Sequence, residues 1–290
     1  MLLSNHSINI LTYTFLKFVG ENDVMKFYKG YIFDMDGVLY LGDEVIQDAI
    51  KAINLLKNKD RKVIFMTNNS SKLASEYKAK IKEIGVSSVE EDEIITSGDV
   101  AAIYLKKELQ ANPDKKNILC VCGDAVKTLM RQIGMNVIDP RDYKNANYVI
   151  ASITTDFNWE IGNYAANAIA VYGAKFIGTN PDVAKPVPNG EIFAGTGAII
   201  KFIETASQTK ATIMGKPYPE IYNAVLQRIK LEKTDTLMVG DLLNTDIKGA
   251  SDFGMDSAFV LTGLDKREDI QRYGITPTYV IESLMELISF

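Results

Sequence analysis

The sequence is poor in the residues that most often carry out acid-base and metal chemistry in enzymes. It has 290 residues but a single histidine, His6, and only two cysteines, Cys120 and Cys122. A Ser-His-Asp triad or a histidine general base could use only His6, and a multi-histidine zinc site has too few histidines. Any chemistry must come from carboxylates, lysines, hydroxyls or amides.

The two cysteines are too few for a disulfide framework or a zinc knuckle. Both lie in the apolar segment 118–122, two residues apart, where they are typical of small buried hydrophobic side chains. We therefore expect a reducing compartment, the cytoplasm, for this chain.

The chain also lacks an excess of positive charge and a long apolar run. Its net charge of −5 argues against nucleic acid as a partner. No stretch approaches the ~18 consecutive apolar residues of a membrane span, so we predict no membrane partner. Met25 leads directly into the first apolar strand, which predicts that the residues before it are an appendage or that translation begins at Met25.

Short β-rich runs alternate with longer helical patterns, which predicts an α/β fold with a doubly wound, mostly parallel sheet. Apolar residues recur at helical spacing in 46–56 and in 77–84, where Gly85 is placed to end the helix. A region rich in proline and glycine, residues 180–197, is the predicted linker. The predicted strands are 31–33, 63–66, 118–122, 148–151, 175–178, 211–214, 236–239 and 257–261.

Two aspartates directly follow the first apolar strand. Asp34 and Asp36 lie at its carboxyl end, where open α/β sheets bind their ligands. Strand alternation predicts a common face for the two carboxylates, which repel each other unless a cation or a shared proton lies between them. On its own this fragment is equally compatible with an Asp-Gly turn and with a metal or acid/base site.

Three further strand ends favour a shared site. The second strand ends in Thr67-Asn68-Asn69-Ser70, which supplies hydroxyl and amide donors. Gly215-Lys216-Pro217 brings a lysine to another strand end, and Gly240-Asp241 adds a carboxylate that Asp246 follows five residues later. Each segment is a weak signal alone, but four in order, all at strand ends, indicate one site.

In these four segments the chain resembles the phosphatases of the haloacid dehalogenase (HAD) superfamily. The matching motifs are 34–40, 67–70, 215–217 and 240–246, and the resemblance runs from about residue 30 to the C-terminus. Only 30 residues separate Asp36 from Thr67, whereas 148 separate Thr67 from Lys216. A cap domain must occupy the longer interval, as in the NagD or p-nitrophenylphosphatase-like subfamily with a C2-type cap.

The resemblance implies a Rossmann-like HAD core sheet with an inserted, smaller α/β cap domain. We predict an N-terminal extension at residues 1–29, the core domain at 30–97 and 186–290, and the cap at 98–185. Relatives often dimerise through the cap, so the resemblance also implies a homodimer of that kind.

The resemblance further implies a Mg²⁺-dependent phosphatase that acts on small phosphorylated metabolites. Its substrates would be p-nitrophenyl phosphate-like esters, phosphoglycolate, or sugar or nucleotide monophosphates. Asp34 is then the nucleophile, and Asp36 the general acid and base. Asp34, the Asp36 carbonyl and Asp241 would hold Mg²⁺, with Asp246 orienting a water or Lys216 behind them.

The remaining motif residues would bind the substrate. Thr67, the Asn68 backbone N–H, Asn69 and the Lys216 ammonium would surround the phosphate oxygens. Lys185 falls in a segment that resembles the subfamily's specificity loop, and a lysine there would favour a second anionic group on the substrate.

Two other kinds of function stay open. A phospho-accepting regulatory or binding protein also combines paired aspartates, a threonine and a lysine, but it needs no insertion of 148 residues between them. Another HAD phosphotransferase, or a relative without turnover, would keep the same fold. The intact set of motif residues favours a phosphatase over these alternatives.

Overall fold

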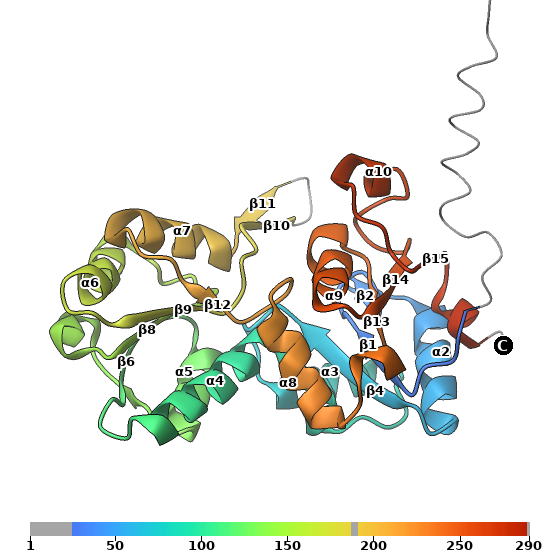
Figure 1. The fold of residues 1–290 in the computed structure, drawn as a ribbon, viewed down its shortest axis with the longest axis horizontal. Coiled ribbons are helices and arrows are strands. Elements are labelled where there is room, and N and C mark those ends of the chain that lie inside the picture. The colour runs from blue at the N-terminus through green and yellow to red at the C-terminus, as the bar shows by residue number, and fades with distance from the viewer. Residues whose placement is uncertain (1–24, 187–190, 289–290) are drawn as a thin grey trace, which may run out of the picture. The chain divides into compact units, whose positions relative to one another are not determined.

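The computed structural model describes residues 25–186 and 191–288, which fold as two compact units (Figure 1). The first unit contains the described residues up to Val63 and those from Leu231, and the second is Ile64–Lys230. Parallel strands alternate with helices in both, which confirms the predicted α/β class. In this part of the chain no helix combines the length and the apolar character that a membrane crossing requires.

The first unit contains four parallel strands in the order β15-β14-β13-β1. They are β1 (Gly30–Phe33), β13 (Thr236–Gly240), β14 (Asp256–Val260) and β15 (Tyr279–Ile281). Every residue of β1 and β13 is buried, as expected for strands covered on both faces. Strand β4 (Lys62–Thr67) begins in this unit, where the Lys62 N–H donates to the Lys29 carbonyl (3.0 Å), and continues into the second.

Helices and short turns complete the first unit. Helix α2 (Gln47–Asn58) buries Ala49, Ile50, Ile53 and Leu56, the apolar positions from which it was predicted. The other elements are β2 (Tyr40–Leu41), β3 (Glu44–Val45), η4 (Lys233–Asp235), η5 (Leu243–Ile247), α9 (Lys248–Phe253), α10 (Asp269–Tyr273) and η6 (Leu284–Ile288).

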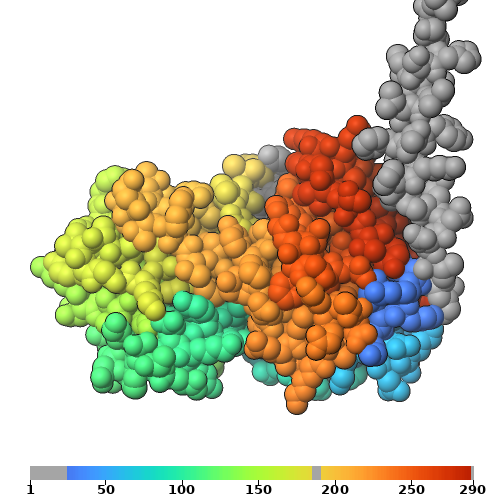
Figure 2. All heavy atoms as spheres, in the orientation of Figure 1, coloured from blue at the N-terminus to red at the C-terminus, as the bar shows by residue number. Residues whose placement is uncertain are grey.

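The second unit is built around a five-stranded parallel sheet in the order β12-β9-β8-β6-β7. Its strands are β6 (Asn117–Val121), β7 (Asn136–Val137), β8 (Tyr148–Ala151), β9 (Lys175–Gly178) and β12 (Thr212–Ile213). Helices α4 (Ser97–Ala111) and α5 (Asp124–Gln132) lie on one side of this sheet, and α6 (Trp159–Ala170) and α7 (Thr196–Ser207) on the other (Figure 1). Figure 2 shows the surface of this unit, with the segment of α4 and α5 in green and the segment of α7 in golden orange.

The rest of the second unit includes a hairpin inside the predicted linker. Within residues 180–197, β10 (Ala184–Pro186) pairs antiparallel with β11 (Ile192–Ala194). The other elements are the end of β4, α3 (Ala74–Glu83), η1 (Glu91–Glu93), β5 (Ile94–Thr96), η2 (Pro140–Asn145) and α8 (Pro219–Ile229).

The predicted domain boundaries stay predictions, because the sheets and the two units divide the chain in different ways. The five-stranded sheet takes β6 to β9 from the predicted cap, 98–185, but its edge strand β12 from the predicted core. The second unit begins inside β4 and ends at Lys230.

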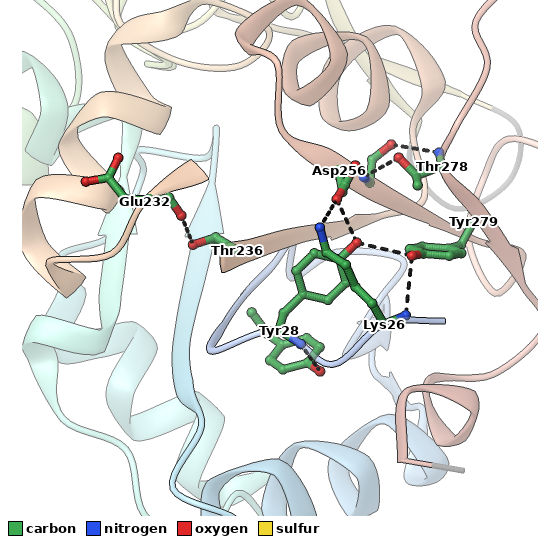
Figure 3. Close-up of polar contacts among 9 residues, drawn as sticks. Lys26, Tyr28, Glu232, Thr236, Asp256, Thr278 and Tyr279 are labelled. Carbon is green, nitrogen blue, oxygen red and sulfur yellow. Dashed lines mark hydrogen bonds and ion pairs between the residues drawn. The ribbon is translucent and has the colours of Figure 1, made fainter. Parts of the chain in front are cut away.

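Two residues of the predicted N-terminal extension, Met25 and Tyr28, are buried in the first unit. The Tyr28 side chain is 1% exposed, and its hydroxyl donates to Asp256 Oδ2 (2.8 Å) and lies 3.3 Å from the Tyr279 hydroxyl (Figure 3). Lys26 Nζ reaches the same Asp256 oxygen (2.7 Å) and lies 4.6 Å from the centre of the Tyr28 ring. Residues 1–24 of the extension, with His6, lie outside the described residues.

Replacing Tyr28 with phenylalanine is expected to lower the free energy of unfolding by about 1–3 kcal/mol. Phenylalanine keeps the buried ring but removes the hydroxyl that donates to the Asp256 carboxylate. Urea denaturation measures the difference. Lys26→Ala removes a half-exposed partner of the same carboxylate and should lower the free energy of unfolding by only about 0–1 kcal/mol. Equal stability of the parent and Tyr28→Phe would contradict the assigned hydrogen bond.

Acid should remove the difference between the parent and Tyr28→Phe. Burial alone would raise the pKa of Asp256, but the hydrogen bonds from Lys26 and Tyr28 outweigh it and hold that pKa below its usual value. Because the folded-state pKa is the lower one, the carboxylate stabilises the fold fully above its unfolded pKa of about 4. This contribution is lost as the pH falls through the folded-state pKa. Repeating the denaturation below about pH 4 checks the sign.

Candidate functional site

Three buried aspartates converge in the first unit at the carboxyl ends of β1 and β13. The two strands pair in parallel with Phe33 opposite Val239, so Asp34 and Asp241 leave the sheet side by side. Asp246 lies in η5, directly after β13. Carboxylate oxygens of Asp34, Asp241 and Asp246 all lie within 4.8 Å of one another, and the three residues are 6%, 1% and 0% exposed.

Backbone N–H groups hold two of these carboxylates in place. Asp241 Oδ2 accepts a hydrogen bond from the Leu264 N–H (2.9 Å), and Asp246 Oδ2 accepts one from the Leu242 N–H (3.1 Å). Hydrogen bonds from N–H groups to ionised carboxylates are among the stronger ones in proteins and orient the acceptor. The aspartates are therefore positioned by the fold itself.

Glycines allow the backbone to approach these carboxylates closely. A Cβ atom at Gly37 or Gly263 would collide with the Asp241 carboxylate, and one at Gly240 would collide with Asp246. Gly37 also has a φ of +81°, which an L side chain rarely adopts. The loop glycines thus let the backbone lie directly against the Asp241 and Asp246 carboxylates.

The cluster has the chemistry of a site for a hard divalent cation. Three carboxylates this close repel one another in a buried setting, and a cation between them relieves the repulsion. Mg²⁺ prefers oxygen ligands and is usually bound by one or two carboxylates together with waters and substrate phosphates. Asp34, Asp241 and Asp246 are therefore the residues that could hold such an ion.

Asp36 differs from Asp34 in its surroundings. Strand β1 ends at Phe33, so the predicted common face of the two carboxylates does not follow from strand alternation. Asp34 is buried and Asp36 is half-buried, in a turn where the Gly37 N–H donates to the Tyr40 carbonyl (2.7 Å). The half-exposed position leaves Asp36 accessible to water.

A second group of predicted site residues lies together in the other unit. Thr67 ends β4, and its Oγ1 accepts a hydrogen bond from the Asn69 N–H (3.0 Å). The Asn68 side chain contacts the backbone of Lys216 twice: Oδ1 accepts from the Lys216 N–H (2.8 Å), and Nδ2 donates to the Lys216 carbonyl (3.0 Å). Thr67, Asn68 and Lys216 are each less than a tenth exposed.

Three residues around Asn68 were not predicted as part of the site. Asn68 Nδ2 also donates to Asp182 Oδ1 and Oδ2 (3.2 and 3.1 Å). The Asn68 carbonyl accepts from Ser97 Oγ (2.6 Å) and from Asn180 Nδ2 (2.8 Å). Asn180 and Asp182 lie at the start of the predicted linker, 180–197, and no role in the site was predicted for them from the sequence.

The structure gives Asn69 a role in shaping the loop. Its Oδ1 accepts from the Ser71 N–H (3.0 Å), and its carbonyl accepts from the Tyr77 hydroxyl (3.2 Å). The backbone of Lys185 pairs with Phe193 in the β10–β11 hairpin, whereas the Lys185 side chain lies outside what the structure describes. Its predicted contact with the substrate stays a prediction.

Comparison with known proteins identifies the family of the chain. Residues 31–136 match the haloacid dehalogenase-like hydrolases, and residues 213–287 match the HAD-hydrolase-like family. Together with the relatives described next, these matches show that the chain belongs to the haloacid dehalogenase-like hydrolases.

The particular relatives are phosphatases. The acid sugar phosphatase of Staphylococcus haemolyticus is 34% identical over 266 residues, which cover 91% of this chain and 97% of that protein. The p-nitrophenyl phosphatase from Archaeoglobus fulgidus has a TM-score of 0.83 at 28% identity, covering 91% and 99% of the two chains. NagD from Escherichia coli K-12 has a TM-score of 0.79 at 27% identity, covering 89% and 98%. These similarities confirm the predicted NagD-like subfamily and the enzyme class, a phosphoric monoester hydrolase.

Proposed function

We propose that the chain is a Mg²⁺-dependent phosphatase that hydrolyses small phosphomonoesters through an aspartyl-phosphate on Asp34. The observation that carries this proposal is the cluster of three buried carboxylates, Asp34, Asp241 and Asp246, at the ends of β1 and β13. Relatives described as acid sugar phosphatase and p-nitrophenyl phosphatase support sugar phosphates and aryl phosphates as substrate classes.

The aspartates divide into metal-holding and reacting groups. Of the groups that could hold Mg²⁺, we assign Asp34, Asp241 and the Asp36 carbonyl as its ligands. Asp246, whose carboxylate lies in the same cluster, would orient a water or Lys216 behind them. The bound ion would reduce the repulsion between the anionic phosphate and the anionic nucleophile. Asp34 keeps one carboxylate oxygen for attack on phosphorus.

The proposed reaction has two displacement steps, both at phosphorus. The Asp34 carboxylate attacks phosphorus as the ester bond breaks, and the leaving alkoxide takes a proton from Asp36. Asp36, now a carboxylate, removes a proton from a water that attacks the aspartyl-phosphate. Inorganic phosphate leaves, and the free carboxylate of Asp34 is restored. The half-buried position of Asp36 suits a group that meets both the leaving group and water.

In the transition state the phosphoryl group carries negative charge on its non-bridging oxygens. In our proposal the Thr67 hydroxyl, the Asn68 backbone N–H and the Lys216 ammonium contact these oxygens, where donors stabilise the transition state most. Asn69 supports the same loop, and Lys185 would favour a second anionic group on the substrate. The homodimer through the cap and the cytoplasmic location remain predictions.

A panel of phosphomonoesters tests the proposed function. Hydrolysis of p-nitrophenyl phosphate, sugar monophosphates, phosphoglycolate and nucleotide monophosphates is measured with Mg²⁺ and ranked by kcat/KM. We expect multiple turnovers, with sugar and aryl phosphates among the best substrates. Stoichiometric phosphorylation without turnover would favour a phospho-accepting protein instead. Transfer to an added alcohol in preference to water would favour a phosphotransferase.

A further inference from the structure

The Asn68 amide holds both ends of the Lys216 backbone. Its Oδ1 accepts from the Lys216 N–H (2.8 Å) and its Nδ2 donates to the Lys216 carbonyl (3.0 Å). One planar side chain therefore fixes the position and the rotation of the peptide units on either side of the lysine. Both residues are buried, Asn68 at 7% and Lys216 at 3% exposure, so water does not compete strongly for these bonds.

Asn68 is itself anchored from the opposite side. Its carbonyl accepts hydrogen bonds from Ser97 Oγ (2.6 Å) and Asn180 Nδ2 (2.8 Å). Ser97 begins helix α4 and is fully buried. The amide of Asn68 thus extends from a fixed backbone, and it can act as a rigid support for Lys216.

The same amide also contacts the base of the β10–β11 hairpin. The second hydrogen of Nδ2 points to the Asp182 carboxylate, with 3.2 and 3.1 Å to its two oxygens. Asp182 precedes β10, and its carbonyl accepts from the Gly197 N–H (2.8 Å), while the Gly195 N–H donates to the Val183 carbonyl (2.8 Å). A shift at the base of the hairpin therefore changes the contacts of Asn68.

Only an amide of this length satisfies all three contacts. Aspartate at position 68 would turn its second oxygen toward two acceptors, the Asp182 carboxylate and the Lys216 carbonyl. Glutamine is one carbon longer, and the space beyond Oδ1 is closed, because a Cβ at Gly215 would lie 2.5 Å from it. The site thus requires the donor and acceptor pattern of asparagine.

We propose that Asn68 is a positioning residue that fixes Lys216 through its backbone and couples it to the β10–β11 hairpin through Asp182. This inference rests on the proposed function, in which the Lys216 ammonium contacts the phosphate. Through this link the hairpin that carries Lys185 and the lysine that neutralises the phosphate share one buried support, so the rate depends on the hairpin's position.

A double-mutant cycle tests the proposal, with p-nitrophenyl phosphate as the substrate. Asn68→Asp should lower kcat about 10²-fold, the cost of displacing a catalytic group by about 1 Å. Asp182→Asn keeps an oxygen that accepts from Asn68 and should lower kcat only a few-fold. In the double variant the donor and acceptor are exchanged between the two positions, so part of the loss from Asn68→Asp should be recovered. Independent effects of the two changes would overturn the coupling.

Further measurements separate positioning from a general loss of structure. Inhibition by inorganic phosphate should weaken in Asn68→Asp when it is measured well below the unfolding midpoint, which the unpaired buried oxygen is expected to lower. Gly215→Ala places a methyl group against Asn68 Oδ1 and should reproduce the kcat loss without changing Asn68. Asn167→Asp, the same change at an exposed position of α6, should leave kcat and phosphate inhibition unchanged.

The parent protein and Lys216→Ala, measured in parallel, distinguish a failure of the proposed function from a failure of the proposed role of Asn68. No turnover by the parent would contradict the proposed function. An active parent, an inactive Lys216→Ala variant and parental kcat in Asn68→Asp would overturn the role of Asn68 alone. A kcat loss in Asn68→Asp that is fully explained by unfolding at the assay temperature would also overturn it.

Discussion

Replacing Asp34 with asparagine is expected to lower the rate of phosphomonoester hydrolysis by about 10⁴-fold or more, the scale on which enzymes lose activity without their nucleophile. The amide nitrogen and oxygen of asparagine fill nearly the same volume, so the buried end of β1 should keep its structure. An amide is a far weaker nucleophile than a carboxylate and carries no charge for a cation. Steady-state kinetics with p-nitrophenyl phosphate measure the loss.

A matched control and a trapping experiment test whether the loss of activity comes from the missing nucleophile. Asp43→Asn makes the same chemical change at an exposed position of the same unit, and it should leave kcat unchanged. Rapid quenching of the parent with labelled substrate should yield a phosphorylated protein that hydroxylamine cleaves, and Asp34→Asn should yield none. Parental activity in Asp34→Asn would rule out the proposed intermediate.

The strands that carry Asp34 and Asp241 could be predicted because both are short, continuous apolar runs that end in a polar residue. The predicted bounds of β1 and β13 differ from the observed ones by one residue each. Their pairing could not be predicted from these runs. Hydrophobic patterning is local, whereas the two strands are about 200 residues apart in the sequence, and only the resemblance to a known family implied that they are neighbours.

The β10–β11 hairpin shows why other elements were missed. Each strand has only three residues, one ends in Pro186, and all of β11 is exposed. Such segments carry neither the alternation of a half-buried strand nor the apolar run of a buried one, so the local pattern favours a loop. Pairing and the Gly195 backbone bond form the hairpin, and both are contacts that a sequence window does not contain.

The candidate site was predictable in its residue types but not in how the protein uses them. A Thr-Asn pair after a strand indicated donors for a ligand, but it did not indicate that the Asn68 side chain contacts Lys216 and Asp182. The partner of a side-chain amide depends on which loops meet around it. Those loops are separated by more than 100 residues here, so no spacing in the sequence marks the contact.

Removing divalent cations is expected to lower turnover about 10³-fold or more, because a bound metal contributes several kcal/mol of charge stabilisation in the transition state. Dialysis against EDTA followed by a Mg²⁺ titration measures this effect, and activity should return with the added ion. Ca²⁺ should restore less activity, since it takes more ligands at longer distances and in a less regular geometry than Mg²⁺. Full turnover in the presence of the chelator would contradict the proposed mechanism.

The same carboxylates should report cation binding without any substrate. Asp34, Asp241 and Asp246 repel one another when no cation is bound, so Mg²⁺ at 100 times its Kd should raise the free energy of unfolding by about 2.7 kcal/mol. Asp241→Asn keeps an oxygen for the Leu264 N–H but removes one charge, and it should weaken Mg²⁺ binding by about 10-fold or more. Glu91→Gln, at an exposed acidic run, should not change the response. A parent protein whose thermal unfolding does not depend on Mg²⁺ would contradict the cation site even if the enzyme were active, because the three charges would then be balanced by the protein itself.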